Sequence, residues 1–167
     1  NGGIITAFNS NFFDNYIDVE QVGPSSTPAG LASASRFYNC NFKTNADIGD
    51  SLSPYAHVNF YRSVGAAFYG CNFEYAAGTV YTNPGYGIYS VNSKFTADKS
   101  GATPNVFKDL DRGVYVNNWN PLNVPSISNS QFINNTGYGA YFMNANTLVF
   151  QKNLVQNPGN YMAWSGV

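Results

Sequence analysis

The segment Pro125–Asn135 reads Pro-Ser-Ile-Ser-Asn-Ser-Gln-Phe-Ile-Asn-Asn and contains a short pattern that recurs along the whole chain. The pattern is anchored on an apolar residue, here Phe132, with a small residue two positions earlier and Asn or Gly, in one copy Gln, three positions earlier. A unit that recurs every ~20–50 residues indicates a solenoid. The anchors follow at intervals of 30, 31, 22, 37 and 22 residues and are Phe12, Phe42, Phe73, Phe95, Phe132 and Leu154.

The spacing inside the pattern predicts the cross-section of this solenoid. The small residue two positions before the anchor lies on the same strand face as the anchor, because strand side chains alternate with period two. The residue five positions before the anchor, Ile127 in this copy, is apolar in most copies. In one continuous strand this odd spacing would place its side chain on the face opposite to the anchor. One residue in the left-handed conformation between them would let both strands face inward, and Asn and Gly adopt that conformation most readily. The expected corner residues are Asn9, Asn39, Gly70, Asn92, Asn129 and Gln151.

We therefore predict an all-β fold, a right-handed single-stranded parallel β-helix of about six coils with no substantial helix. The six anchors should form one inward stack. Polar segments interrupt the repeats and are expected to be loops, at residues 22–30, 46–55 and 96–107. Variable loops on a regular rod are where such solenoids build their functional surface.

Composition limits the class of protein. The 167 residues carry a net charge of −1, with 10% charged and 17% aromatic residues, so nothing indicates a nucleic-acid partner. The sequence contains no run of 18 apolar residues, which is about the length that a transmembrane helix needs. Residues 1–167 are expected to form one domain, since no break in composition divides them. Both ends read like the interior of a coil, so we expect the chain to be part of a longer protein.

Several forms in the chain resemble the right-handed parallel β-helix repeats of large secreted proteins of Bacteroidetes. They are Gly-Ile-Tyr, Asn-Ser-Gln-Phe-Ile-Asn-Asn, and the pair His57–Phe60 and Tyr69–Phe73. The resemblance implies an exported protein of the type IX secretion route, secreted or held at the cell surface and outer membrane. The resemblance says little about activity, but the absence of a converging set of acid and base residues, together with ends that read like coil interiors, favours a non-enzymatic, adhesin-like rod that presents loops for adhesion, assembly or an envelope complex. The alternative is the repeat region of a polysaccharide lyase or glycoside hydrolase, because the same fold carries both roles.

The cysteines Cys40 and Cys71 occupy the same position in successive repeats, so they should be stacked roughly 4.8 Å apart. That spacing falls within the Cα separations of disulfides, and an exported protein would permit one. The other interpretation is a pair of free thiols filling the small-residue position that Ser10, Ser93 and Ser130 fill elsewhere. We favour the free thiols, because side chains stacked in register run parallel.

Candidate acidic residues are Asp47 and Asp50 in one loop, and Asp109 and Asp111 before Arg112. Calcium sites and lyase sites use such carboxylates, the latter with a Lys or Arg base. Arg112 occupies a position that Tyr86 and Tyr138 occupy in neighbouring repeats, which is typical of a solvated surface. The single His57 has no acid close in sequence and is expected on a strand. We therefore predict no catalytic residue, no metal site and no cofactor.

Two further sites are predicted. Tyr115 and Trp119 are candidate carbohydrate contacts, because sugars bind over aromatic faces flanked by amides; carbohydrate or other envelope proteins are the expected partners. Asp50-Ser51-Leu52 resembles the O-glycosylation site of exported Bacteroidetes proteins, with the glycan carried on Ser51. The interpretation we favour for Tyr115 and Trp119 is nevertheless that they belong to the ordinary Tyr- and Asn-rich surface of the rod.

Overall fold

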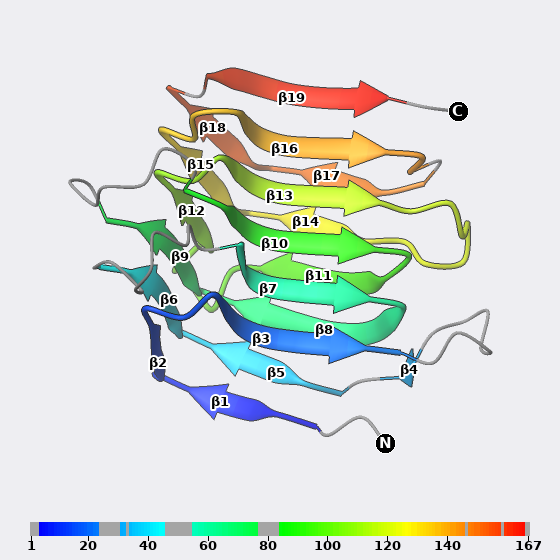
Figure 1. The fold of residues 1–167 in the computed structure, drawn as a ribbon, viewed down its shortest axis with the longest axis horizontal. Coiled ribbons are helices and arrows are strands. Elements are labelled where there is room, and N and C mark those ends of the chain that lie inside the picture. Colours follow the sequence, from blue (N-terminus) through cyan, green and yellow to red (C-terminus); the bar gives the residue numbers. More distant parts are fainter. Residues whose placement is uncertain are drawn as a thin grey trace.

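The computed structural model describes residues 4–23, 31–32, 34–45, 55–76, 84–145, 147–157 and 159–165, and within these ranges it contains strands and no helix. The strands form three parallel sheets, each with six strands stacked in sequence order, and one of the sheets has a seventh, short strand beside this stack. Figure 1 shows the three sheets as the sides of one rod, with the first strand at one end and the last strand at the other. The predicted parallel β-helix is confirmed.

Each coil contributes one strand to sheet A, then one to sheet B and one to sheet C. Sheet A comprises β1 (Thr6–Phe8), β5 (Arg36–Tyr38), β8 (Ser63–Tyr69), β11 (Lys94–Asp98), β14 (Ser126–Ser128) and β17 (Val149–Gln151), with β4 (Leu31–Ala32) paired beside β8. Sheet B comprises β2 (Asn11–Phe13), β6 (Asn41–Thr44), β9 (Asn72–Tyr75), β12 (Val106–Lys108), β15 (Gln131–Ile133) and β18 (Leu154–Gln156). Sheet C comprises β3 (Ile17–Val22), β7 (Ala56–Tyr61), β10 (Tyr86–Val91), β13 (Arg112–Asn117), β16 (Tyr138–Met143) and β19 (Asn160–Ser165).

The coils wind with the expected hand and number. In Figure 1 the chain runs along sheet C in front, returns along sheet A behind and rises by one strand per circuit, which is a right-handed path. Six strands in each sheet correspond to six coils. Every coil is joined to the next by parallel pairing with matched registers, such as Phe42 opposite Phe73 in sheet B.

The corner between sheets A and B is a single left-handed residue in most coils, as predicted. Asn9, Asn39, Gly70 and Asn129 have φ values of 49°, 51°, 65° and 49°. In the last coil the left-handed residue is Lys152, with φ of 55°, and not Gln151. The predicted corner is one residue too early, because the repeat was aligned on Leu154 and not on Val155, which pairs with Phe132.

Two of the six predicted anchors are wrong. Phe95 lies on sheet A opposite Ala66, and Phe107 takes the sheet B position between Phe73 and Phe132. Leu154 is 51% exposed, and Val155 pairs with Phe132 instead. Asn92 is left-handed as expected, but it turns the chain from sheet C into sheet A. The same local sequence therefore serves two different corners of the coil.

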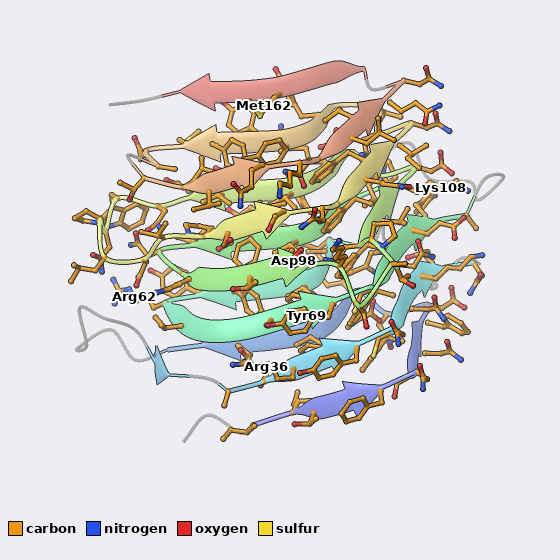
Figure 2. All side chains as sticks on the ribbon, turned by 180° about the vertical axis from the view of Figure 1, so that it is seen from behind. Arg36, Arg62, Tyr69, Asp98, Lys108 and Met162 are labelled. Carbon is orange, nitrogen blue, oxygen red and sulfur yellow. The ribbon has the colours of Figure 1, made fainter. Side chains whose placement is uncertain are left out.

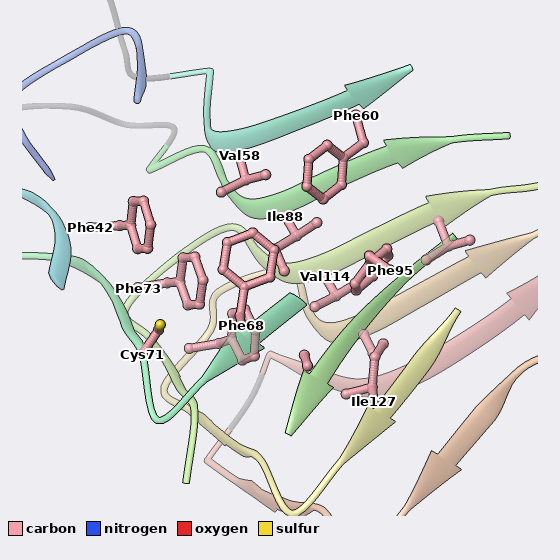
Figure 3. Close-up of a cluster of buried hydrophobic side chains, with 14 of the residues drawn as sticks. Phe42, Val58, Phe60, Phe68, Cys71, Phe73, Ile88, Phe95, Val114 and Ile127 are labelled. Atoms are coloured by element: carbon pink, nitrogen blue, oxygen red, sulfur yellow. The ribbon is translucent and has the colours of Figure 1, made fainter. Parts of the chain in front are cut away.

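The interior is filled by aromatic rings stacked from coil to coil. The rings of Phe12, Phe42, Phe73, Phe107 and Phe132 lie 4.7–4.9 Å apart with interplanar angles of 4–8°. A second column from sheet A packs edge-on against them, for example Phe68 against Phe73. Figure 3 shows these rings converging with the aliphatic side chains of sheet C. Burying each such side chain contributes ~1.5–3 kcal/mol, so this column supplies much of the stability of the fold.

Candidate functional site

The two cysteines are free and buried. The Cys40 thiol donates to the carbonyl of Ala7 at 3.6 Å, and the Cys71 thiol to the carbonyl of Phe37 at 3.4 Å, each in the preceding coil. Burial raises the pKa of the Cys71 thiol to about 12. Both residues thus fill the small-residue position beneath the sheet A to sheet B corner, as the favoured interpretation predicted, and Cys71 keeps its proton at neutral pH.

The acidic segment before Arg112 does not form a paired-carboxylate site. Asp109 and Asp111 lie in the turn between β12 and β13, and not on one face of a strand, where their Asp-x-Asp spacing would place both carboxylates side by side. Asp109 contacts Lys108 at 3.3 Å, whereas Asp111 contacts Arg112 at 3.5 Å, and the buried Leu110 separates them. Each carboxylate is therefore held by a different cation.

Arg112 is not a solvated surface residue, which corrects the sequence-based interpretation. Its guanidinium carbon lies 5.0–5.8 Å from the centroids of four tyrosine rings, and its side chain is 27% exposed. A guanidinium this close to aromatic faces gains cation–π stabilisation of about 0.5–2 kcal/mol. The rings belong to three successive coils and are Tyr86, Tyr115, Tyr138 and Tyr141.

His57 lies on strand β7, as expected, but it has an acidic partner that the sequence did not reveal. Its Nδ1 lies 2.6 Å from a carboxylate oxygen of Asp18 in the preceding coil, and both side chains are almost fully buried. Its Nε2 lies 3.3 Å from the backbone carbonyl of Glu74. A carboxylate and a carbonyl are both acceptors, so each ring nitrogen of His57 faces an oxygen of another residue. His57 consequently has no free nitrogen with which to act as a base.

The two candidate carbohydrate contacts differ in how accessible their rings are. Tyr115 is 8% exposed, and its ring is stacked between Tyr89 at 4.8 Å and Tyr141 at 5.7 Å, so both of its faces are covered. Trp119 is 54% exposed in the segment after β13. A sugar could thus reach the ring of Trp119 but not a face of Tyr115. Asp47, Asp50 and Ser51 lie outside the described residues.

The fourth coil departs from its neighbours at the sheet A to sheet B corner. In place of one left-handed residue, residues 99–104 form a tight hairpin in which Ser100 and Thr103 exchange backbone hydrogen bonds of 2.8 and 2.9 Å. The flanking residues predicted as loop at 96–98 and 106–107 belong to strands β11 and β12. The hairpin is the short projection beside Asp98 in Figure 2.

Asn105 anchors this hairpin from below. Its side chain is fully buried and accepts a hydrogen bond from the backbone N–H of Cys71 at 2.7 Å. Its amide donates to the carbonyls of Phe68 at 3.2 Å and Asp98 at 2.7 Å. Asn153 makes similar bonds in the last coil, to Ser130 N–H and the carbonyl of Ile127. A side-chain amide thus bonds backbone groups of the coil beneath it both at the hairpin corner and at the regular corner of the last coil.

Gly70 gives the hairpin room on its N-terminal side. A Cβ at Gly70 would lie 2.6 Å from the side-chain oxygen of Asn39 and 2.8 Å from the Cβ of Ser100. Close approach, together with a φ of 65°, therefore requires glycine where the other regular corners have Asn or Lys. The hairpin leans on the third coil and leaves space on the side of the fifth and sixth coils.

That space is a groove of about 250 Å³. The hairpin forms one wall, and the corners of the fifth and sixth coils form the other. We refer to it as the corner groove; its lining residues are Lys99, Ala102, Pro104, Asn129, Ser130, Gln131, Lys152 and Leu154.

The corner groove differs in its charges from the middle of sheet B. There, lysines of neighbouring coils pair with one acid: Glu74 lies 3.6 Å from Lys43 and 2.9 Å from Lys108. Burial tends to raise the pKa of Glu74, but hydrogen bonds from Lys108 and Asn72 and the nearby lysine charges outweigh it and leave that pKa lowered. Within the described ranges, the ammonium groups of Lys99 and Lys152 have no such partner.

The acid nearest to this groove is already engaged. Asp98 accepts a hydrogen bond from the side-chain amide of Asn129 at 2.7 Å and another from the backbone N–H of Lys99 at 2.8 Å. The sequence-based reasoning missed the groove, although the unusually long interval of 37 residues between anchors marked the place where the regular corner is interrupted.

Comparison with known proteins adds no relative: no protein-family model matches the chain, and neither the curated proteins nor the solved structures gave a match. In the part of the chain that the structure describes, no three His, Cys, Asp or Glu side chains converge as metal ligands do. The same described ranges contain no helix long and apolar enough to cross a lipid bilayer.

Proposed function

We propose that the chain is a non-enzymatic β-helix rod whose corners and loops are presented for adhesion or assembly within a larger secreted or cell-surface protein. One observation carries this proposal: the side chains with catalytic chemistry are engaged in contacts, mostly with neighbouring coils. His57 contacts Asp18 of the coil before it and the backbone of the coil after it. Arg112 is surrounded by tyrosines of adjacent coils and by Asp111.

Such contacts favour a structural role for the charged residues. General acid–base catalysis needs a group that can take or give a proton within hydrogen-bond reach of a substrate. Glu74, the acid between two lysines on sheet B, is bound across coils and forms a ladder with Lys43 and Lys108. Residues used in this way join successive coils and stiffen the rod, which suits a protein that holds a surface at a distance.

The setting belongs to the same proposal. The resemblance to Bacteroidetes repeats suggests export by the type IX route, with envelope proteins or carbohydrate as partners and a location outside the cell or on the outer membrane. Glycosylation of Ser51 would support that setting, and peptide mass spectrometry of material from the native host tests it. An unmodified peptide that covers Asp47–Tyr55 at full occupancy would count against the setting and leave the rod untouched.

The competing function is the repeat region of a polysaccharide lyase or hydrolase. Purified protein should be incubated with uronic-acid polymers and with neutral polysaccharides, with and without calcium, and new chain ends should be measured. We expect no cleavage above the level of a buffer control. Cleavage that the Asp111→Ala variant abolishes would overturn the proposal, whereas binding without cleavage would support it.

A further inference from the structure

We propose that the corner groove binds an anionic sugar unit, whose carboxylate or sulfate contacts the ammonium groups of Lys99 and Lys152. This inference rests on the proposed role as a presenting rod and names the ligand class that one of its corners takes. No residue in this groove is given a catalytic role. Figure 2 shows the face that carries Asp98 and the hairpin beside it.

Charge is the first argument. Lys99 and Lys152 come from different coils, yet both line this one groove. By contrast, the two lysines of the ladder on sheet B, Lys43 and Lys108, face Glu74, and Arg112 faces Asp111. Two lysines beside one acid leave a local excess of one positive charge. Asp98 accepts the hydrogen bonds from Asn129 and from the backbone of Lys99 on one oxygen, Oδ1, and its single charge is outweighed by the two lysines. An incoming anion can therefore pair with the lysines.

The second argument is the composition of the lining. It combines polar and apolar groups, which can contact the hydroxyl groups and the C–H groups of a sugar ring. Asn129 and Gln131 offer amide donors and acceptors for hydroxyl groups. Ala102, Pro104 and Leu154 offer small apolar surfaces for the C–H face of a sugar ring. A volume of about 250 Å³ is slightly below the ~300–1,000 Å³ typical of small-ligand sites. It fits one or two sugar units of a longer chain.

Strand pairing argues against an acidic peptide as the occupant. Extended peptides commonly bind by adding a strand to an open sheet edge. Strand β15 beside the groove is paired on both sides, with β12 and β18, and β14 is paired with β11 and β17. The open strand edges of the sixth coil, on β17 and β18, lie on the side turned away from β14 and β15, so recognition within the groove relies on side chains.

The groove is also preorganised. Asn105 fixes the base of the hairpin through three hydrogen bonds, and Gly70 lets the hairpin rest on the third coil. A wall fixed before binding lowers the ordering cost of association. The lysine side chains are then the main groups that lose freedom when the ligand binds.

The test measures binding of three matched trisaccharides to the full chain by calorimetry and by backbone amide shifts: trigalacturonate, a sulfated galactose trimer and the neutral galactose trimer. Lys99→Gln and Lys152→Asn remove the two charges, and Asn suits the left-handed φ of residue 152. Lys94→Gln is the matched control, because Lys94 is an exposed cation without a side-chain partner among the described residues and lies outside the groove.

We expect an anionic trimer to bind about tenfold or more tightly than the neutral one, with shifts at Asn129 and Gln131. The double variant should lose about tenfold or more in affinity and the control less than about twofold, with all proteins keeping the same melting temperature. The better of the two anionic trimers identifies carboxylate or sulfate as the group bound.

Three outcomes would overturn the inference: equal binding of the neutral trimer, an equal loss in the Lys94→Gln control, or tighter binding of a triglutamate peptide than of either anionic sugar. Failure here leaves the rod proposal intact. Cleavage of the bound trimer would instead overturn the rod proposal while supporting the groove.

Discussion

The sheet A to sheet B corner is built in two ways, and the fifth and fourth coils show the difference. In the fifth coil one left-handed residue, Asn129, turns the chain, and Ser130 fills the space beneath it. In the fourth coil a hairpin at 99–104 makes the same connection, and Asn105 fills the equivalent space. Strands β12 and β15 nevertheless pair in register. The coil thus accepts an insertion at its corner as long as the backbone groups of the neighbouring coils keep their partners.

The largest expected loss of stability tests whether the core of the fourth coil, which carries the hairpin, is packed as tightly as the core of a coil with a regular corner. Phe107→Ala should destabilise the protein by about 3–5 kcal/mol, as Phe73→Ala should, because both rings lie fully buried in one stack. Leu154→Ala should cost less than about 1 kcal/mol, since Leu154 is exposed. Urea unfolding measures all three. A Phe107→Ala variant as stable as Leu154→Ala would place Phe107 outside the core.

A second effect isolates the irregular corner. Asn105→Ala should cost about 2–3 kcal/mol, because it leaves the buried N–H of Cys71 and two carbonyls without their partner. Ser130→Ala, the matched change in the regular corner, removes one hydroxyl bond to Ser128 and should cost about 1 kcal/mol. Equal losses in unfolding experiments would show that the hairpin does not depend on the amide.

Glycine substitutions give a smaller effect. Gly101→Ala should cost about 1 kcal/mol, because its φ is 58° but nothing lies within 4 Å of the added Cβ. Gly70→Ala should cost about 2 kcal/mol, since the same kind of strain is joined by collisions with Asn39 and Ser100. Melting temperatures of the two variants give the comparison. If Gly101→Ala proved the more harmful, the close packing of the hairpin on the third coil would be wrong.

The smallest effect concerns the charged ladder on sheet B. Its lysine partners lower the pKa of Glu74 below the ordinary value of 4.5, so the carboxylate stabilises the fold above that pH and loses its contribution as the pH falls through its lowered pKa. Glu74→Gln should therefore cost about 0.5–1 kcal/mol at pH 7 and less than that at pH 3. Denaturant unfolding at both pH values checks this, and a loss that does not change with pH would contradict an ionic role.

The regular parts of the fold could be predicted from sequence because their causes are local. A left-handed Asn such as Asn39 followed by an inward Phe specifies a corner and a strand within a few residues. The local pattern also explains the wrong assignment of Phe95. A left-handed Asn precedes Phe95 as well, but Asn92 joins sheet C to sheet A, whereas Asn39 joins sheet A to sheet B. Chain-order spacing alone does not say which of the three corners a left-handed residue occupies.

The candidate site was not predictable for a different reason. The direction of the hairpin depends on contacts between Gly70 and Ser100, and the partner of His57 lies 39 residues away at Asp18. Such pairs appear only once the coils are stacked. Lys99 and Lys152 likewise share a groove because of coil stacking, although nothing in the intervening sequence relates them.

The bonds of Asn105 also make neighbouring coils depend on each other. Two of its three partners, Phe68 and Cys71, belong to the coil that precedes it in the chain. The fourth coil therefore cannot complete its corner without the third, and the third coil needs the amide of the fourth to satisfy its own backbone. Where each repeat contacts only its neighbours, folding can begin at any coil and spread to the next. A hairpin inserted at one corner then changes the stability of two adjacent coils and leaves the contacts of more distant coils as they are.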